Sequence, residues 1–237
     1  MLLVGPSNSG KTTWLKNLIQ HADALHTKPI DRIIYCYDHY QPIYDEMRAL
    51  NPKKIHFVYG MPPESMLLEK RPGGENKKYE TLLIMDDLMM KLNMETLSNL
   101  YTSGRQIGVN PILVLHNLTH RGRNTGSGNS SLLTISRNCS YRVLFSVPSD
   151  IKNVRTLQSQ MFPHLPGFLM AAYQDACCSH PYGYLVLDSR PTSDNNARAY
   201  TKIWPREETT FYIPPNHNRP QLTIPGGQVV EIDYTVQ

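Results

Sequence analysis

The feature that most constrains the fold of this 237-residue chain is a glycine-bounded loop close to its start. The apolar residues 2–4 are followed by Gly-Pro-Ser-Asn-Ser-Gly-Lys-Thr at residues 5–12, which fits the pattern G-x-x-x-x-G-K-[ST]. The apolar run predicts a buried strand, and apolar residues at helical spacing predict a helix from Lys11 to about Ala24. A strand, a loop of this type and a helix in succession predict a phosphate-binding site.

The residue types of the loop suit that chemistry. Gly10 lets backbone N–H groups turn toward phosphate oxygens without a clash from a Cβ atom. Lys11 can bring its ammonium group to the β- and γ-phosphates, and Thr12 can offer its hydroxyl to Mg²⁺. A chance match in a glycine turn is the alternative, but it would not explain the flanking strand and helix. We therefore expect ATP to contact Gly5, Pro6, Ser7, Asn8, Ser9, Gly10, Lys11, Thr12 and Thr13.

Composition excludes several other classes of protein. The chain is 40% hydrophobic and 19% charged, which is typical of a folded globular protein and not of a disordered one. Neither a membrane-spanning run nor a signal peptide is recognisable in the sequence. The four cysteines have no metal-ligand spacing, and two of them are adjacent. These features predict an intracellular protein that is neither secreted nor in a membrane.

A second chemical signal lies at residues 80–87, where four apolar residues run into Asp86 and Asp87. This pattern predicts a buried parallel strand, and ligands of open α/β sheets gather at the carboxyl ends of such strands. Asp86 is therefore placed to hold Mg²⁺, and Asp87 to orient or deprotonate an attacking water. An Asp-Asp pair alone can also be a strand-to-helix turn with an N-cap.

The elements between and after these signals predict an α/β fold. We expect further strands at residues 33–37, 55–59, 112–115, 141–145 and 184–188, and helices at 41–50, 88–101, 150–161 and 167–176. The strand at 112–115 ends at His116 and Asn117, either of which can contact the γ-phosphate or the attacking water, or simply be a polar strand end. The arrangement suits a P-loop NTPase of the ASCE division, with a mostly parallel sheet flanked by helices.

Two regions differ from the rest of the chain. Residues 101–155 contain one acid, Asp150, and seven basic residues, a bias that suits DNA or nucleotide phosphates unless it is only a solvated face. Arg121 and Arg123 lie there in a glycine-rich loop, and we expect them to contact DNA.

From Arg190 onward prolines interrupt the pattern, with short strands at 199–204 and 229–234. We therefore predict an ATPase domain at residues 1–190 and an irregular, Pro-rich C-terminal extension at 191–237.

Several segments together resemble the FtsK–HerA superfamily of DNA-pumping ATPases. They are GPSNSGKTTWLKNLI, RIIYCYDHYQPIYDEM, LLIMDD, GRQIGVNPILVLHN, SRNCSYRVLFSVPSDIKNVRTLQ and PYGYLVLD. Within that superfamily they are similar to viral genome-packaging ATPases of the poxvirus type and their relatives in Polinton-like and adintovirus-like elements. The similarity covers roughly residues 1–190, and the combination is more specific than the phosphate loop alone.

The resemblance implies roles for single residues. It gives Lys11 and Thr12 the phosphate and Mg²⁺ roles, Asp86 the metal role and Asp87 the role of catalytic acid. The sensor position, usually Gln in the superfamily, is His116 here, with Asn117 as the alternative. Arg105 and Arg142 are both candidates for an arginine finger that reaches the γ-phosphate of a neighbouring subunit.

The sequence thus predicts a motor that uses ATP and Mg²⁺ to translocate double-stranded viral DNA into a capsid. By resemblance it would act as a homo-oligomeric ring, a hexamer, together with a capsid or portal protein, in the infected cell or virion. A P-loop small-molecule or nucleoside kinase, a replication helicase and a nucleotide-regulated binding module remain as alternatives.

Overall fold

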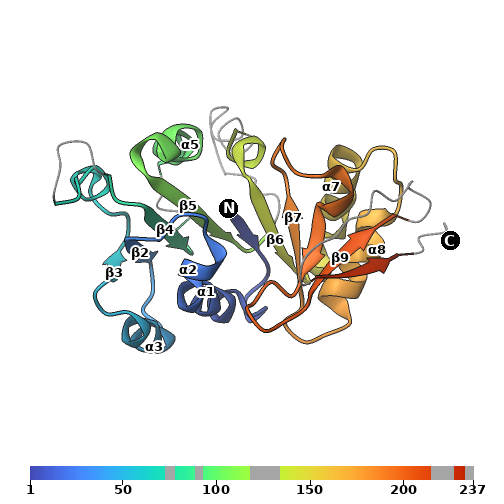
Figure 1. The fold of residues 1–237 in the computed structure, drawn as a ribbon, viewed down its shortest axis with the longest axis horizontal. Coiled ribbons are helices and arrows are strands. Elements are labelled where there is room, and N and C mark those ends of the chain that lie inside the picture. The colour runs from blue at the N-terminus through green and yellow to red at the C-terminus, as the bar shows by residue number, and fades with distance from the viewer. Residues whose placement is uncertain (73–77, 89–92, 118–133, 215–226, 233–237) are drawn as a thin grey trace. The chain divides into compact units, whose positions relative to one another are not determined.

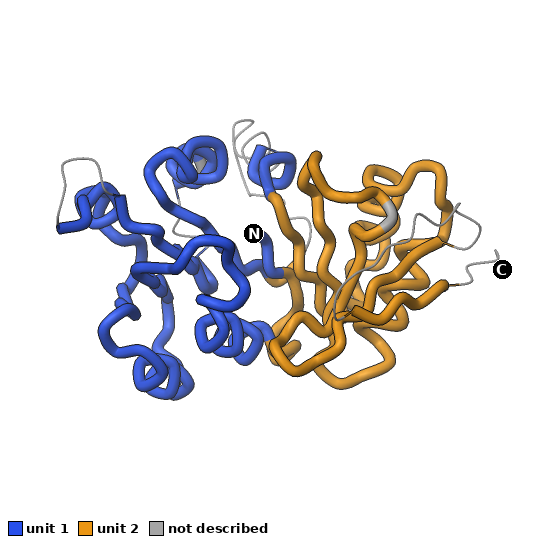
Figure 2. The backbone as a smooth tube through the Cα atoms, viewed as in Figure 1, with its two compact units in different colours: residues 1–3, 11–115, 120–139 blue, residues 4–10, 116–119, 140–237 orange. Residues whose placement is uncertain are grey.

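The computed structural model describes residues 1–72, 78–88, 93–117, 134–214 and 227–232. Within these residues the chain divides into two compact units, which Figure 2 shows in different colours. Unit 1 comprises residues 1–3, 11–115 and the described part of 120–139. Unit 2 comprises residues 4–10, 116–117 and the described part of 140–237. The chain passes between them several times, so each unit is built from segments distant in sequence.

Unit 1 is built around parallel strands. Neighbouring strands follow the order β1 (Leu2–Val4), β5 (Val109–Leu115), β4 (Thr81–Asp86), β2 (Arg32–Tyr37) and β3 (Ile55–Tyr59). β4 pairs in parallel with β5 and β2, and β2 pairs in parallel with β3. At the start of the chain, the Leu113 N–H donates to the Met1 carbonyl over 3.0 Å. β5 therefore lies between β1 and β4, although it follows both in sequence.

Helices lie on both faces of these strands. They are α1 (Lys11–Gln20), α2 (Ala22–Leu25), α3 (Ile43–Leu50), α4 (Glu64–Leu67), α5 (Met94–Ser103) and the 3₁₀ turn η1 (Gly104–Ile107). Figure 1 shows α1 and α3 on one face of the strands and α5 on the other. α1 buries Trp14, Leu15, Leu18 and Ile19. Covering both faces explains why β4 is apolar along most of its length instead of alternating.

Two helix predictions need correction in unit 1. The helix predicted from Lys11 to Ala24 is divided at His21 into α1 and α2. The prediction that a helix begins at Leu88 is wrong, because Asp87 and Leu88 are not helical and α5 begins at Met94. Asn93 caps that helix, its Oδ1 accepting the N–H groups of Glu95 and Thr96 over 2.9 and 3.3 Å. A strong N-cap thus sets a later start than the apolar pattern suggested.

Unit 2 is mainly antiparallel. Its strands are β6 (Tyr141–Phe145), β7 (Tyr184–Asp188), β8 (Ala199–Thr201), β9 (Thr209–Ile213) and β10 (Gly227–Glu231). β6, β7, β8 and β9 pair in that order in antiparallel fashion, whereas β10 pairs with β9 in parallel. Its helical segments are η2 (Pro148–Asp150), α7 (Ile151–Met161), α8 (Phe168–Tyr173), the π-helix η3 (Gln174–Cys178) and η4 (Asn195–Ala197). Over the described strands as a whole the sheet is mixed and mostly parallel, as predicted.

The segment predicted as a C-terminal extension contributes strands to unit 2. β8 and β10 fall where short strands were expected, whereas β9 was not predicted. β8 pairs with β7, which lies on the other side of the predicted boundary at residue 190. The division into a domain at 1–190 and an extension at 191–237 stays a prediction.

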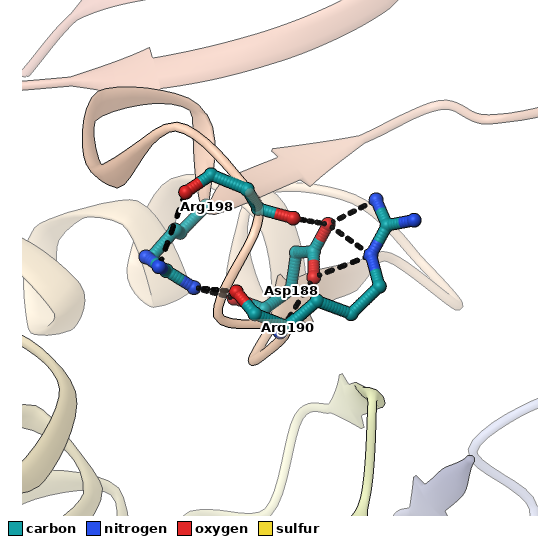
Figure 3. A network of polar contacts seen from close by, with 4 residues as sticks. Asp188, Arg190 and Arg198 are labelled. Carbon is teal, nitrogen blue, oxygen red and sulfur yellow. Dashed lines mark hydrogen bonds and ion pairs between the residues drawn. The ribbon is translucent and has the colours of Figure 1, made fainter.

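A polar network fixes the turn after β7 (Figure 3). Asp188, 4% exposed, accepts hydrogen bonds from Arg190 Nη2 and Ser193 Oγ, both over 2.7 Å to Oδ2. Arg198 Nη1 donates to the Asp188 and Arg190 carbonyls over 3.0 and 2.8 Å. Burial favours a higher pKa for Asp188, but the hydrogen bonds from Arg190 and Ser193 outweigh it and hold the pKa below its ordinary value. The network ties β7 to the segment that leads into β8.

The chain's two tryptophans lie one in each unit. Trp14 is buried in α1 of unit 1. Trp204 of unit 2 packs against Tyr184 of β7, with ring centroids 6.1 Å apart. Among the described residues, no helix combines the length and the apolar character that a membrane span requires.

Candidate functional site

The phosphate loop joins β1 to α1. Asn8 and Gly10 have positive φ angles of 63° and 94°, and the Ser9 N–H donates to the Pro6 carbonyl over 3.3 Å. These left-handed residues turn the chain sharply before α1 begins at Lys11. The first N–H groups of a helix have no partner within the helix, so they are available to an anion placed there.

Two observations test whether the loop fits a phosphate group. The Oγ atom of Ser9 is buried and has no hydrogen-bond partner among the described residues. A Cβ atom on Gly5 would lie 2.5 Å from this oxygen and 2.8 Å from Phe145 Cβ, so only glycine fits there. A buried hydroxyl without a partner is costly in a native protein. A phosphate oxygen in the loop would satisfy it, so the residues present fit the group.

Lys11 lies at the first position of α1 and is 8% exposed. Burial lowers the pKa of its ammonium group, while the nearby carboxylates of Asp87 and Asp86 act in the opposite direction. The structure therefore brings Lys11 close to both acids within unit 1. This part of unit 1 therefore contains a buried ammonium group together with two nearby carboxylates of opposite charge.

Asp86 is the last residue of β4 and is 3% exposed. Its Oδ2 accepts a hydrogen bond from the Tyr35 hydroxyl over 2.6 Å and one from the Tyr44 hydroxyl over 3.3 Å. Burial raises the pKa of Asp86, and the Tyr35 hydrogen bond opposes that rise. Both tyrosines donate to the same oxygen, Oδ2, so these two hydrogen bonds hold the carboxylate in one orientation.

Sequence reasoning missed Tyr35 and Tyr44. Tyr35 comes from the middle of β2 and Tyr44 from α3, and their ring centroids lie 5.0 Å apart. Burial raises the pKa of both hydroxyls, and the charge of Asp86 raises it further. Tyrosine-rich strands are usually read as core, and only the pairing of β2 with β4 and the packing of α3 show that these hydroxyls reach the acid.

Asp87 differs from Asp86 in its exposure to solvent and in its backbone conformation. It is exposed and has a φ of 55°, in the left-handed region. Non-glycine residues in this region are uncommon, although Asp and Asn tolerate it best, and such residues cluster at functional sites. The turn sends one carboxylate inward and the next one outward, so the two acids are suited to different tasks.

The other predicted site residues lie as follows. Thr12 and Thr13 are in the first turn of α1, half-buried and exposed respectively. His116 and Asn117 are exposed residues that directly follow β5, the parallel neighbour of β4. They belong to unit 2, whereas Asp86 belongs to unit 1. Arg121 and Arg123 lie outside the described residues.

The two candidate arginine fingers have contrasting surroundings. Arg105 is exposed in η1 of unit 1. Arg142 of β6 is 8% exposed, and its Nη1 donates a hydrogen bond to Ser189 Oγ within unit 2. A finger must reach out to a neighbouring subunit, so the surroundings of Arg105 suit that role better.

The model of the family described as "Poxvirus A32 protein" matches residues 1–160. Among solved structures, the genome packaging NTPase B204 from Sulfolobus turreted icosahedral virus 2, in complex with ATP-gammaS, is 16% identical with a TM-score of 0.47. That match covers 79% of this chain and 90% of the other. No curated protein sequence matches.

Proposed function

Because the chain belongs to the poxvirus A32 protein family, we propose that it is an ATPase that moves double-stranded viral DNA into a capsid. The family confirms the predicted resemblance to packaging ATPases of the poxvirus type. The observation that best supports hydrolysis is the buried Lys11 beside Asp86 and Asp87, directly after a phosphate loop.

The loop and Lys11 would hold the phosphates of ATP. Backbone N–H groups of residues 7–12 would face phosphate oxygens, and Ser9 Oγ would gain the partner it lacks among the described residues. Thr12 and Asp86 would hold Mg²⁺, whose charge offsets that of the phosphates. Tyr35 and Tyr44 would keep the Asp86 carboxylate in one orientation for that purpose.

Asp87 would act on the attacking water. Its exposed carboxylate sits one residue beyond the metal acid, in a backbone turn that few other residue types tolerate. His116 or Asn117, after the neighbouring strand, would sense the γ-phosphate. Catalysis would be mainly positional and electrostatic, as in other phosphoryl transfers.

We assign the arginine finger to Arg105, because Arg142 is buried against Ser189 in its own subunit. A finger supplied by a neighbour requires an oligomer, and a homo-oligomeric ring, a hexamer by family resemblance, would supply one at every site. Arg121 and Arg123 would contact DNA phosphates, as part of the basic bias of residues 101–155. A capsid or portal protein would receive the ring.

The decisive experiment measures ATP hydrolysis with and without long duplex DNA, together with the oligomeric state of the same sample. We expect DNA to stimulate hydrolysis by a ring, and Lys11→Ala or Asp87→Asn to abolish it. The double variant Arg121→Ala/Arg123→Ala should lose only the stimulation. Lys16→Ala is a matched control, because Lys16 lies on the same helix in a surface ion pair with Glu46.

Other outcomes would contradict the proposal. Transfer of phosphate to a nucleoside without release of free phosphate would indicate a kinase. Separation of the strands of forked DNA would indicate a helicase. Binding of ATP without any hydrolysis would indicate a nucleotide-regulated binding module.

A further inference from the structure

One exposed aromatic side chain stands directly against the phosphate loop. Tyr182 is 71% exposed, yet a Cβ atom placed on Gly10 would lie 3.0 Å from Tyr182 Cδ1 and 3.2 Å from its Cβ. Both residues belong to unit 2. The ring therefore starts at the loop and extends into solvent beside the point where phosphates would bind. A lone exposed tyrosine needs no explanation, but its location beside this loop does.

The chain around Tyr182 is held in costly conformations. Tyr182 has a φ of 59°, a left-handed conformation that is unusual for a bulky residue. The next residue, Gly183, leaves no room for a side chain, since a Cβ atom would lie 2.2 Å from the Ala176 carbonyl oxygen. Just before this turn comes the π-helix η3, a rare element that is frequent at functional sites. Strain of this kind persists where the surrounding structure requires it, which makes it a pointer to function.

We propose that Tyr182 is the platform on which the base of the bound nucleotide stacks. This inference rests on the proposed function, because it needs phosphates in the loop. Ribose and base are attached to the α-phosphate, so they must leave the loop across the adjoining surface. Tyr182 offers a large aromatic ring on that surface, next to Gly10 of the loop.

Stacking defines a substrate class. A ring packed on the π-face of a base does not read the hydrogen-bonding edge, so it accepts any base. Tyr182 would therefore bind nucleoside triphosphates in general and would not by itself select adenine. Removal of the ring should weaken ATP and GTP to the same extent.

The test compares a nucleotide with inorganic triphosphate, which has the phosphates but no base. We expect Tyr182→Ala to weaken ATP and GTP binding about 5- to 150-fold, the loss that corresponds to one base–aromatic stack. Binding of inorganic triphosphate should not change. Tyr182→Phe should bind ATP like the wild type, because the ring is kept. Titration of each variant with the three ligands, followed by calorimetry, gives these affinities.

Tyr59→Ala is the matched control, because Tyr59 is 67% exposed at the end of β3 in unit 1. It should leave all three affinities unchanged. Equal weakening of ATP and inorganic triphosphate by Tyr182→Ala would mean that Tyr182 only supports the loop. An unchanged ATP affinity would mean that it contacts no base. Both results overturn this inference alone, whereas a wild-type protein that binds none of the ligands overturns the proposed function as well.

Discussion

At the scale of single residues, Asp86, the proposed metal ligand, depends on neighbours that its own segment does not contain. Asp86 is buried, and a buried carboxylate is stable only when hydrogen bonds replace the lost water. Tyr35 and Tyr44 provide two such bonds from β2 and α3. Their contribution can be measured in the protein without nucleotide.

We predict that Tyr35→Phe lowers the free energy of unfolding by about 1.5–3 kcal/mol, the usual worth of a hydrogen bond to a charged group. Tyr44→Phe should cost less, because its hydroxyl lies 3.3 Å from Oδ2 compared with 2.6 Å for Tyr35. Urea unfolding followed by circular dichroism measures both. Tyr37→Phe, in the same strand, is the control and should change stability little. Equal effects at Tyr35 and Tyr37 would contradict the proposed support of Asp86.

The sequence revealed one part of the site and concealed another. Lys11, Asp86 and Asp87 were predictable, because a phosphate loop and an apolar strand ending in acids are local patterns with known chemistry. Tyr35, Tyr44 and Tyr182 were not, because each lies against a residue that is far away in the sequence. Only strand pairing and packing reveal such contacts.

At the scale of elements, the turn that carries Arg105 depends on a glycine. Gly108 ends η1 with a φ of 76°, and a Cβ atom there would lie 2.3 Å from the Tyr79 carbonyl oxygen. Gly60 has a similar φ of 72° but nothing within 4 Å of its would-be Cβ. The two positions therefore separate the cost of the backbone conformation from the cost of a clash.

We predict that Gly60→Ala costs about 1–2 kcal/mol, the strain of a left-handed alanine. Gly108→Ala should cost more, because the same strain is joined by an overlap with backbone that cannot rotate away. Denaturant midpoints of the two variants give the comparison. If both variants lose the same free energy of unfolding, the close approach of Gly108 to the Tyr79 carbonyl does not contribute to the cost.

The network at the end of β7 gives a prediction about pH. The lowered pKa of Asp188 means that its ionised form stabilises the folded protein above the carboxyl's ordinary pKa of 3.8. This stabilisation is lost as the pH falls through the lower pKa of the folded state. Asp188→Asn should therefore be less stable than the wild type at pH 7, by about 1.5–3 kcal/mol, with a smaller difference near pH 3. Thermal unfolding at both pH values tests it, and a difference that does not depend on pH would contradict it.

The elements themselves were predicted with uneven success. Strands β2 to β6 and helix α7 lie close to their predicted positions. Their apolar residues follow the pattern of a strand or the spacing of a helix without interruption over several residues. The start of α5 and the presence of β9 were not predicted. The Asn93 cap sets the start of α5, and pairing with β8 supports β9. Neither interaction is visible in the periodicity of the sequence.

At the scale of the whole molecule, the proposed arginine finger would act between subunits. We predict that Arg105→Ala and Lys11→Ala are each inactive alone but regain part of the activity when mixed. In a mixed ring, some sites combine an intact loop from one subunit with an intact finger from another. Arg48→Ala, which removes an exposed arginine of α3, should keep full activity. A mixture as inactive as its components would argue against a finger in trans.

The positions of the two tryptophans turn the division into units into an optical measurement. Trp204→Phe leaves emission from Trp14 in unit 1, and Trp14→Phe leaves emission from Trp204 in unit 2. Because the chain passes between the units at residues 3–4, 10–11, 115–116, 119–120 and 139–140, we expect both emissions to change at one urea concentration. Two separate midpoints would instead show that each unit melts by itself. Each unit thus carries its own fluorescent probe, and the emission wavelength of that tryptophan reports when the unit unfolds.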